Sequence, residues 1–160
     1  MSRTGGFPLF SYQRGLLRGG FMEADGLREL VEGAASRAGL LLVDVQLVQT
    51  GRRVLLRVLA DRQGRITIGE CASLSREIGD LLDAHGILDR DYTLEVSSPG
   101  IGRPLSSSAD WLRCEGRTLS IRTEQGEQRG VLSGCNDGNL VLDGDVRIPV
   151  DSVLEAREVI

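Results

Sequence analysis

Residues 92–105, which read YTLEVSSPGIGRPL, limit what this chain can fold into more than any other stretch. Up to residue 97 the apolar and polar side chains alternate, which is typical of a half-buried strand. Prolines, which lack a backbone donor, and glycines then follow, so regular structure should end here. We therefore predict a strand followed by an interdomain linker over residues 99–105, with one domain on either side. The linker residues that we single out are Ser98, Pro99, Gly100, Gly102, Arg103 and Pro104.

The chain before the linker contains two runs with helical spacing and three that alternate. The helical runs are 27–38 and 71–82, and the alternating runs are 40–48, 54–60 and 92–97. A capping box, Thr67 with Glu70, precedes the second helical run, and a short polar turn joins the first two alternating runs into a hairpin. In the first alternating run we expect Leu41, Val43, Val45 and Leu47 to fall on one side. The order helix, strand, strand, helix, strand predicts a two-layer α+β domain over residues 22–98.

The chain after the linker has short strand candidates separated by turn signals. They are 117–123, 128–133, 140–143, 146–149 and 153–159. Five strands are too few for a sandwich. Because closing a sheet protects its edges, we predict a small, bent, five-stranded β-barrel over residues 106–160.

Composition narrows the cellular setting and the class of partner. The formal net charge is -4, the wrong sign for a protein that grips nucleic acid over its whole surface. The cysteines, Cys71, Cys114 and Cys135, are odd in number and far apart, which favours a reducing, cytoplasmic setting. No apolar run approaches the roughly 20 residues that a membrane helix needs, so we expect no membrane contact.

Residues 1–21 carry arginine but no acid, are rich in glycine, and show no periodic apolar pattern. We predict a disordered extension there. A second hypothesis is that the native protein begins at Met22, because the codons for Gly19, Gly20 and Phe21 could resemble a ribosome-binding site.

The sequence offers no catalytic constellation. His85, the only histidine, falls at a predicted helix C-terminus, where a cation is favoured by the helix dipole. Ser97 and Ser98 lie in no G-x-S-x-G motif, and turn formation explains them more simply. The cysteines lack metal-ligand spacing. We therefore expect no enzyme activity, no cofactor and no metal.

Charge segregation favours binding instead. Between residues 51 and 65 the only acid is Asp61, against Arg52, Arg53, Arg57, Arg62 and Arg65. Such a patch could bind RNA phosphates, since the guanidinium fork suits them. The alternative is a hairpin that is merely solvated.

The sequences of several segments resemble those of one family. EVSSPGIGRPL, then a segment with Trp111, then GRTLSI, GVLSG and VRIPVDSVLEAR, is similar to the bacterial ribosome maturation factor RimP family from Gly26 to the C-terminus. One departure is Gly102, where the family usually carries Asp. The resemblance implies that the barrel is Sm-like. It also implies a non-enzymatic assembly factor that binds the free small ribosomal subunit, with the barrel docking on a small-subunit ribosomal protein.

Three classes of function follow. If the chain is an assembly factor, we expect a monomer whose arginine hairpin meets rRNA, and whose barrel meets a basic ribosomal protein through Asp143, Asp145 and Asp151. The alternative is a KH-like RNA-binding regulator not dedicated to the ribosome, although the sequence has no G-x-x-G clamp. A hydrolase or transferase acting through Ser97 or Ser98 is the remote third class.

Overall fold

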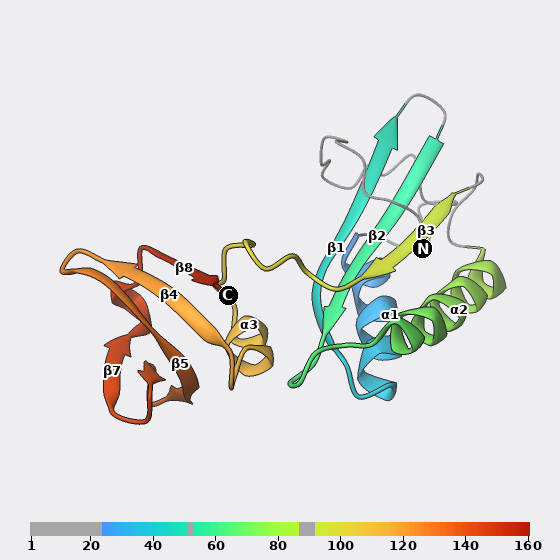
Figure 1. Cartoon of the computed structure of the whole chain (residues 1–160). Helices are drawn as coiled ribbons and strands as arrows, with labels where there is room; N and C mark the ends of the chain where they lie inside the picture. The colour runs from blue at the N-terminus through green and yellow to red at the C-terminus, as the bar shows by residue number, and fades with distance from the viewer. Residues whose placement is uncertain (1–23, 51–52, 87–91) are drawn as a thin grey trace. The chain divides into compact units, whose positions relative to one another are not determined.

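The structure, a computed structural model, describes residues 24–50, 53–86 and 92–160 (Figure 1). The predictions for residues 1–21 and for Arg52 lie outside these ranges. The chain forms two compact units. The first contains the described residues up to Asp61 together with Ile66–Ser98, and the second contains Arg62–Arg65 together with Pro99–Ile160.

The first unit is a three-stranded sheet with two helices. Its elements are α1 (Ala24–Arg37), β1 (Leu41–Thr50), β2 (Arg53–Asp61), α2 (Ile68–His85) and β3 (Thr93–Ser97). The strand order is β1-β2-β3, with β1 antiparallel and β3 parallel to β2. Apolar side chains from both helices and from all three strands form one buried core. This arrangement confirms the predicted α+β class and the predicted order of the elements.

The capping box before α2 is present as predicted. The Thr67 hydroxyl accepts a hydrogen bond from the backbone N–H of Glu70 (3.1 Å), and the Glu70 carboxylate accepts one from the N–H of Thr67 (2.8 Å). Two N–H groups that the first turn leaves free are satisfied in this way. The helix ends at Gly86, whose φ of 57° is left-handed and suits glycine.

The prediction that Leu41, Val43, Val45 and Leu47 share one side of β1 is partly wrong. The strand contains a β-bulge between Leu42 and Asp44, which shifts its pairing with β2. Leu42 precedes the bulge and Leu47 follows it, and both lie in the core. Two residues with an odd spacing can share a face because the extra residue of the bulge moves the following side chains to the other face. Leu41 and Val43 do not belong to this core cluster.

The second unit is a single antiparallel sheet with a short helix. Its elements are α3 (Ser108–Arg113), β4 (Thr118–Thr123), β5 (Gly126–Asn136), β6 (Asn139–Leu142), β7 (Val146–Pro149), the 3-10 turn η3 (Val150–Ser152) and β8 (Glu155–Glu158). The strand order is β7-β6-β5-β4-β8. A β-bulge between Leu132 and Gly134 lets the long strand β5 pair with β4 along one half and with β6 along the other.

The predicted barrel is not closed. The number of strands agrees with the prediction, but the edge strands β7 and β8 do not pair with each other. Both strands have only four residues, Pro149 at the end of β7 lacks a donor, and η3 turns the chain between them. The sheet therefore keeps two edges, and it bends around a core that contains Trp111, Leu119 and Leu132.

Helix α3 was not predicted, although the sequence carries its signal. Ser107 and Asp110 form a second capping box, with Asp110 N–H donating to the Ser107 hydroxyl (3.1 Å). The S-x-x-D spacing marks the helix start. The helix brings Trp111 into the core of the second unit, and Cys114, the first residue after the helix, lies in the same core. None of the helices in the described part of the chain is long and apolar enough to cross a membrane.

Candidate functional site

The structure does not bring the predicted arginines together. Arg53 begins β2 and Arg62 follows its end, so the length of the strand, about 30 Å, separates them. Arg57 lies between them and is mostly buried, because only 11% of its side chain is exposed. Arg52 lies outside the described residues, and the other four arginines lie in different settings, so the five-residue patch stays a prediction.

Arg57 is committed to the sheet. It faces away from the helices, and its Nε donates to Glu95 Oε1 at 2.9 Å. The register explains this contact, because Arg57 on β2 lies directly beside Glu95 on β3. Glu95 is 1% exposed, so this ion pair is shielded from water. Since its guanidinium is held in this way, Arg57 is a structural residue in this unit and not a free phosphate ligand.

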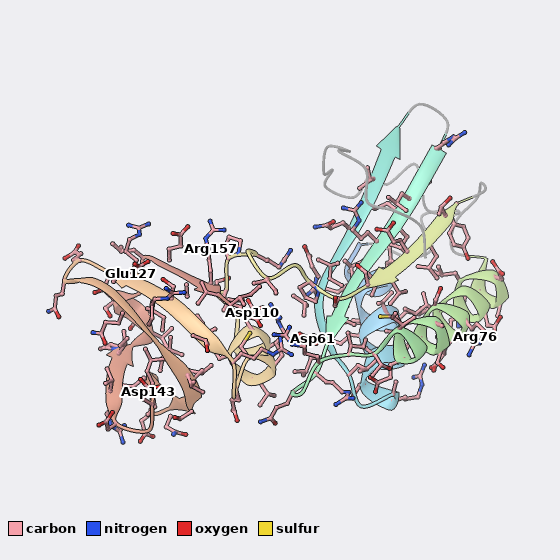
Figure 2. The ribbon with its side chains drawn as sticks, in the orientation of Figure 1. Asp61, Arg76, Asp110, Glu127, Asp143 and Arg157 are labelled. Carbon is pink, nitrogen blue, oxygen red and sulfur yellow. The ribbon has the colours of Figure 1, made fainter. Side chains whose placement is uncertain are left out.

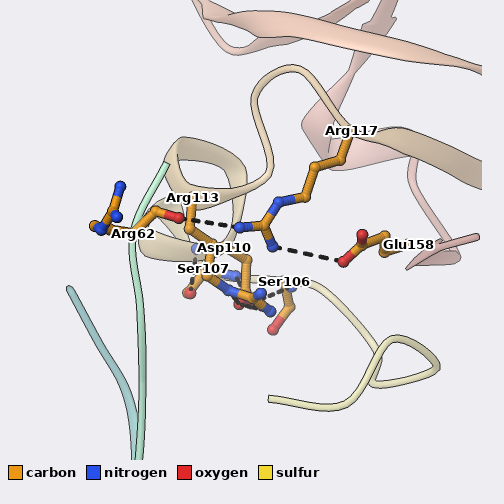
Figure 3. Close-up of polar contacts among 7 residues, drawn as sticks. All are labelled: Arg62, Ser106, Ser107, Asp110, Arg113, Arg117 and Glu158. Carbon is orange, nitrogen blue, oxygen red and sulfur yellow. Dashed lines mark hydrogen bonds and ion pairs between the residues drawn. The ribbon is translucent and has the colours of Figure 1, made fainter. Parts of the chain in front are cut away.

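Arg62 and Arg65 belong to a polar network of the second unit. Figure 3 shows its members Arg62, Arg117 and Glu158. The Arg62 carbonyl accepts a hydrogen bond from the Arg117 guanidinium (3.0 Å), and Arg117 also pairs with Glu158 (3.5 Å). Arg65 forms an ion pair with the same Glu158 carboxylate. Arg117 and Glu158 are both mostly buried. Their contacts hold the segment Arg62–Arg65, and Glu158 partly neutralises the charge of Arg65.

Arg53 remains the arginine best placed to meet a phosphate. Its side chain is exposed, and it makes no hydrogen bond or ion pair with another described residue. It lies at the start of β2 and follows Arg52 in the sequence, a residue outside the described ranges. The hypothesis of an RNA contact therefore narrows to this end of the hairpin.

A buried carboxylate in the second unit has a structural role. Asp110, which is 4% exposed, accepts hydrogen bonds from the backbone N–H groups of Ser106 (2.9 Å) and Ser107 (3.0 Å), and it pairs with Arg113 (Figure 3). Burial acts to raise the pKa of Asp110, but these donors and the Arg113 charge outweigh it and hold the pKa below its usual value. Asp110 is therefore ionised at neutral pH and caps α3.

The three acids predicted to meet a protein lie in different settings. Asp143, labelled in Figure 2, follows β6 with a positive φ of 54°, and its Oδ1 accepts a hydrogen bond from Val131 N–H (2.9 Å). It thereby stabilises the bend of β5. Asp145 is exposed in the same turn, and Asp151 is exposed in η3. Asp145 and Asp151 are thus the two members that the fold leaves available.

Asp151 borders a surface groove that sequence reasoning missed. The groove has a volume of about 400 Å³ and lies between the β4–β5 turn and the segment formed by β7 and η3. Ile148, Pro149 and Leu154 supply apolar surface to it. Leu154 is 56% exposed, which is unusual for a leucine. Sequence reasoning missed the groove because its lining comes from two stretches that are separate in the sequence, 123–128 and 147–154.

The linker residues nearest the second unit are attached to its last strand. Leu105 N–H donates to the Ala156 carbonyl (2.8 Å), and Pro104 forms an isolated bridge with Arg157. The Arg157 guanidinium also donates to the Gly102 carbonyl. A Cβ at Gly102 would have no neighbour within 4 Å, so the glycine at this position is not required by packing.

The residues that could carry chemistry are dispersed or inactive. Cys71 and Cys114 are buried, and burial raises the pKa of both thiols, which disfavours the reactive thiolate. Ser97 ends β3, and His85 is exposed in the last turn of α2. Within 24–50, 53–86 and 92–160, no group of three His, Cys, Asp or Glu residues could hold a metal ion.

Part of the chain is similar to a known protein family. The family model described as the RimP N-terminal domain matches residues 30–102. The match begins within α1, spans the remaining elements of the first unit and reaches the linker as far as Gly102. It thus covers the sheet that carries Arg53, Arg57 and Glu95.

Proposed function

Because the chain belongs to the RimP family, we propose that it is a ribosome maturation factor that binds the free small ribosomal subunit. The single observation that carries this proposal is the match of the RimP N-terminal domain to residues 30–102. The absence of a catalytic constellation in the sequence fits a role in binding. In this proposal the protein acts in the cytoplasm as a monomer and needs no cofactor.

The proposed contact with rRNA uses Arg53 and, beside it in the sequence, Arg52. Arg53 is exposed and makes no ion pair within the described chain, so its guanidinium can donate to phosphate oxygens without first breaking another contact. Since the chain has a net charge of -4, attraction to RNA must be local. In this proposal Arg57 does not contact RNA. Its ion pair with Glu95 joins β2 to β3 and so supports the strand that carries Arg53.

The proposed contact with a ribosomal protein uses the second unit. Ribosomal proteins are generally basic, and the exposed carboxylates of Asp145 and Asp151 attract such a surface. Asp143 contributes charge to the same region, although its carboxylate also holds β5. Two weak contacts on one particle give a higher apparent affinity than either contact alone.

The experiment is cosedimentation of the full chain with free small subunits, free large subunits and whole ribosomes. We expect selective binding to free small subunits. Equal binding to all three particles would indicate generic RNA affinity, as the KH-like alternative predicts, and absence of binding to any particle would contradict the proposal.

A charge-reversal variant tests the rRNA contact. Arg53→Glu should weaken binding to the small subunit and lower the salt dependence of log K by about one unit of slope for each phosphate that the arginine no longer neutralises. Arg76→Glu is the matched control, because Arg76 is an exposed arginine on α2 whose guanidinium donates to the nearby Ser73 hydroxyl (3.3 Å). Equal effects of the two substitutions would show that only net charge matters.

A further inference from the structure

The groove of the second unit lies along the outer edge of β7. Three consecutive residues of this strand, Arg147, Ile148 and Pro149, line it. In the sheet order β7 has a neighbouring strand, β6, on one side only. Among the described residues, the outer edge of β7 therefore has no strand beside it. An extended polypeptide can add to such an edge through backbone hydrogen bonds.

Apolar and acidic side chains both line the groove. Ile148, which is 4% exposed, and the more exposed Leu154 provide the apolar contact. Glu124, in the β4–β5 turn, and Asp151, in η3, add two negative charges against one positive charge from Arg147. The excess negative charge repels the phosphates of RNA and attracts lysine or arginine side chains.

We propose that this groove binds an extended segment of a basic protein, which lies along β7 and places an apolar side chain against Leu154. Lysine or arginine side chains of the segment pair with Glu124 and Asp151. The inference deepens the proposed function and rests on it for the source of the segment, a small-subunit ribosomal protein. In this proposal Glu124, Asp151 and Leu154 dock the protein segment, and Asp143 and Asp145 in the β6–β7 turn contribute less.

The alternating geometry of a strand makes the proposal specific. Side chains of an added strand point alternately toward and away from the groove. A matching segment therefore carries its apolar residue and its nearest groove-facing basic residue two positions apart. Random basic peptides without such an apolar residue should bind more weakly, because burial of a leucine-sized group is the main gain of free energy.

The test uses an array of short overlapping peptides that cover the small-subunit ribosomal proteins, probed with the full chain. We expect wild type to bind a subset of peptides that contain basic residues around an apolar one. Leu154→Ser should weaken this binding at least about tenfold, since an anchoring leucine is worth more than 1.4 kcal/mol. Leu112→Ser is the matched control, because Leu112 is 48% exposed on α3 and does not line the groove.

A second variant separates charge from packing. Glu124→Gln combined with Asp151→Asn should weaken binding of the same peptides at low salt and have less effect on it at high salt. The proposal is overturned if wild type binds no peptide, if Leu154→Ser and Leu112→Ser behave alike, or if the peptides that lose binding carry no basic residue. Cosedimentation with the small subunit tests the proposed function separately, so peptide binding without cosedimentation would refute that function and leave the groove assignment standing.

Discussion

Arg57 and Glu95 form an ion pair between the parallel strands β2 and β3, with 2.9 Å between Nε and Oε1. The carboxylate is 1% exposed and the arginine side chain 11%. A buried charge that loses its partner is costly because water cannot replace the partner. The pair therefore makes the joining of the two strands depend on both residues.

The first prediction concerns this pair. Glu95→Gln should destabilise the protein by about 3–5 kcal/mol, because the Arg57 charge stays buried while its counter-ion is removed. The measurement is the urea unfolding midpoint. The control is Glu77→Gln, which breaks an exposed ion pair with Arg37 at 2.7 Å and should cost at most about 1 kcal/mol. Equal midpoints for the two variants would show that the Arg57 charge reaches water.

The second prediction concerns Gly130 on β5. A Cβ at this position would lie 2.7 Å from Asp143 Oδ2, and moving that carboxylate weakens its hydrogen bond to Val131 N–H. Gly130→Ala should therefore cost about 1 kcal/mol. In an Asp143→Gly background the same substitution should cost much less, because the obstacle is gone. A thermodynamic cycle of unfolding free energies measures this coupling, and additive effects of the two substitutions would contradict it.

Gly102→Ala is the control for the Gly130 substitution. Gly102 has open space where its Cβ would lie, so the alanine should leave the unfolding midpoint unchanged. The same geometry predicts that Gly102→Asp, which restores the residue usual in the family, is tolerated.

The third prediction is a tyrosine titration. Tyr92 donates its hydroxyl hydrogen bond to Asp83 Oδ1 (3.1 Å), and burial together with the Asp83 carboxylate raises the pKa of Tyr92 to about 12. The contribution to stability is fully present below the unfolded tyrosine pKa of about 10 and is lost as pH rises toward about 12. Phenolate absorbance should show a late titration that Tyr92→Phe removes. Asp83→Asn should move it to lower pH, and an unchanged curve would show that Asp83 does not act on the phenol.

The fourth prediction concerns Asp110. Asp110→Asn should cost about 1.5–3 kcal/mol at neutral pH, because charge-assisted hydrogen bonds from Ser106, Ser107 and Arg113 are weakened. Because the pKa of Asp110 is lowered, its contribution is present above the unfolded carboxyl pKa of about 3.9 and disappears as pH falls through the folded value. The difference in unfolding free energy between wild type and variant should therefore shrink in acid.

Ser107→Ala is the control for Asp110→Asn. It removes the hydroxyl that accepts from Asp110 N–H (3.1 Å) and should cost about 1 kcal/mol, with the same value in acid as at neutral pH. If the cost of Asp110→Asn is equally independent of pH, the carboxylate is not ionised when it caps α3.

The elements that sequence reasoning predicted correctly are those with a local cause. The capping box of Thr67 and Glu70 fixes the start of α2 within four residues, and the left-handed glycine Gly86 ends it. The bulge in β1 had no such signal. Residues 40–43 are all apolar, so either face of the strand could have been buried, and only the pairing with β2 decides.

The candidate site depended on contacts that are distant in the sequence. Arg57 looked like part of a basic patch because Glu95 lies 38 residues away and meets it only through the parallel register of β2 and β3. Likewise, Arg65 is paired with Glu158 at a separation of 93 residues. The groove beside Leu154 is lined by residues 123–128 and 147–154, which only the fold brings together.

The parallel pairing of β2 with β3 also sets an order of events during synthesis. The chain that leaves the ribosome first contains β1, β2 and α2, while Glu95 is still to be made. Until β3 arrives, Arg57 lies on the edge strand of a hairpin, where water can solvate its charge. Addition of β3 then removes that edge and supplies the counter-ion in one step. A nascent chain or truncation that stops before Glu95 should therefore remain an open, protease-sensitive intermediate.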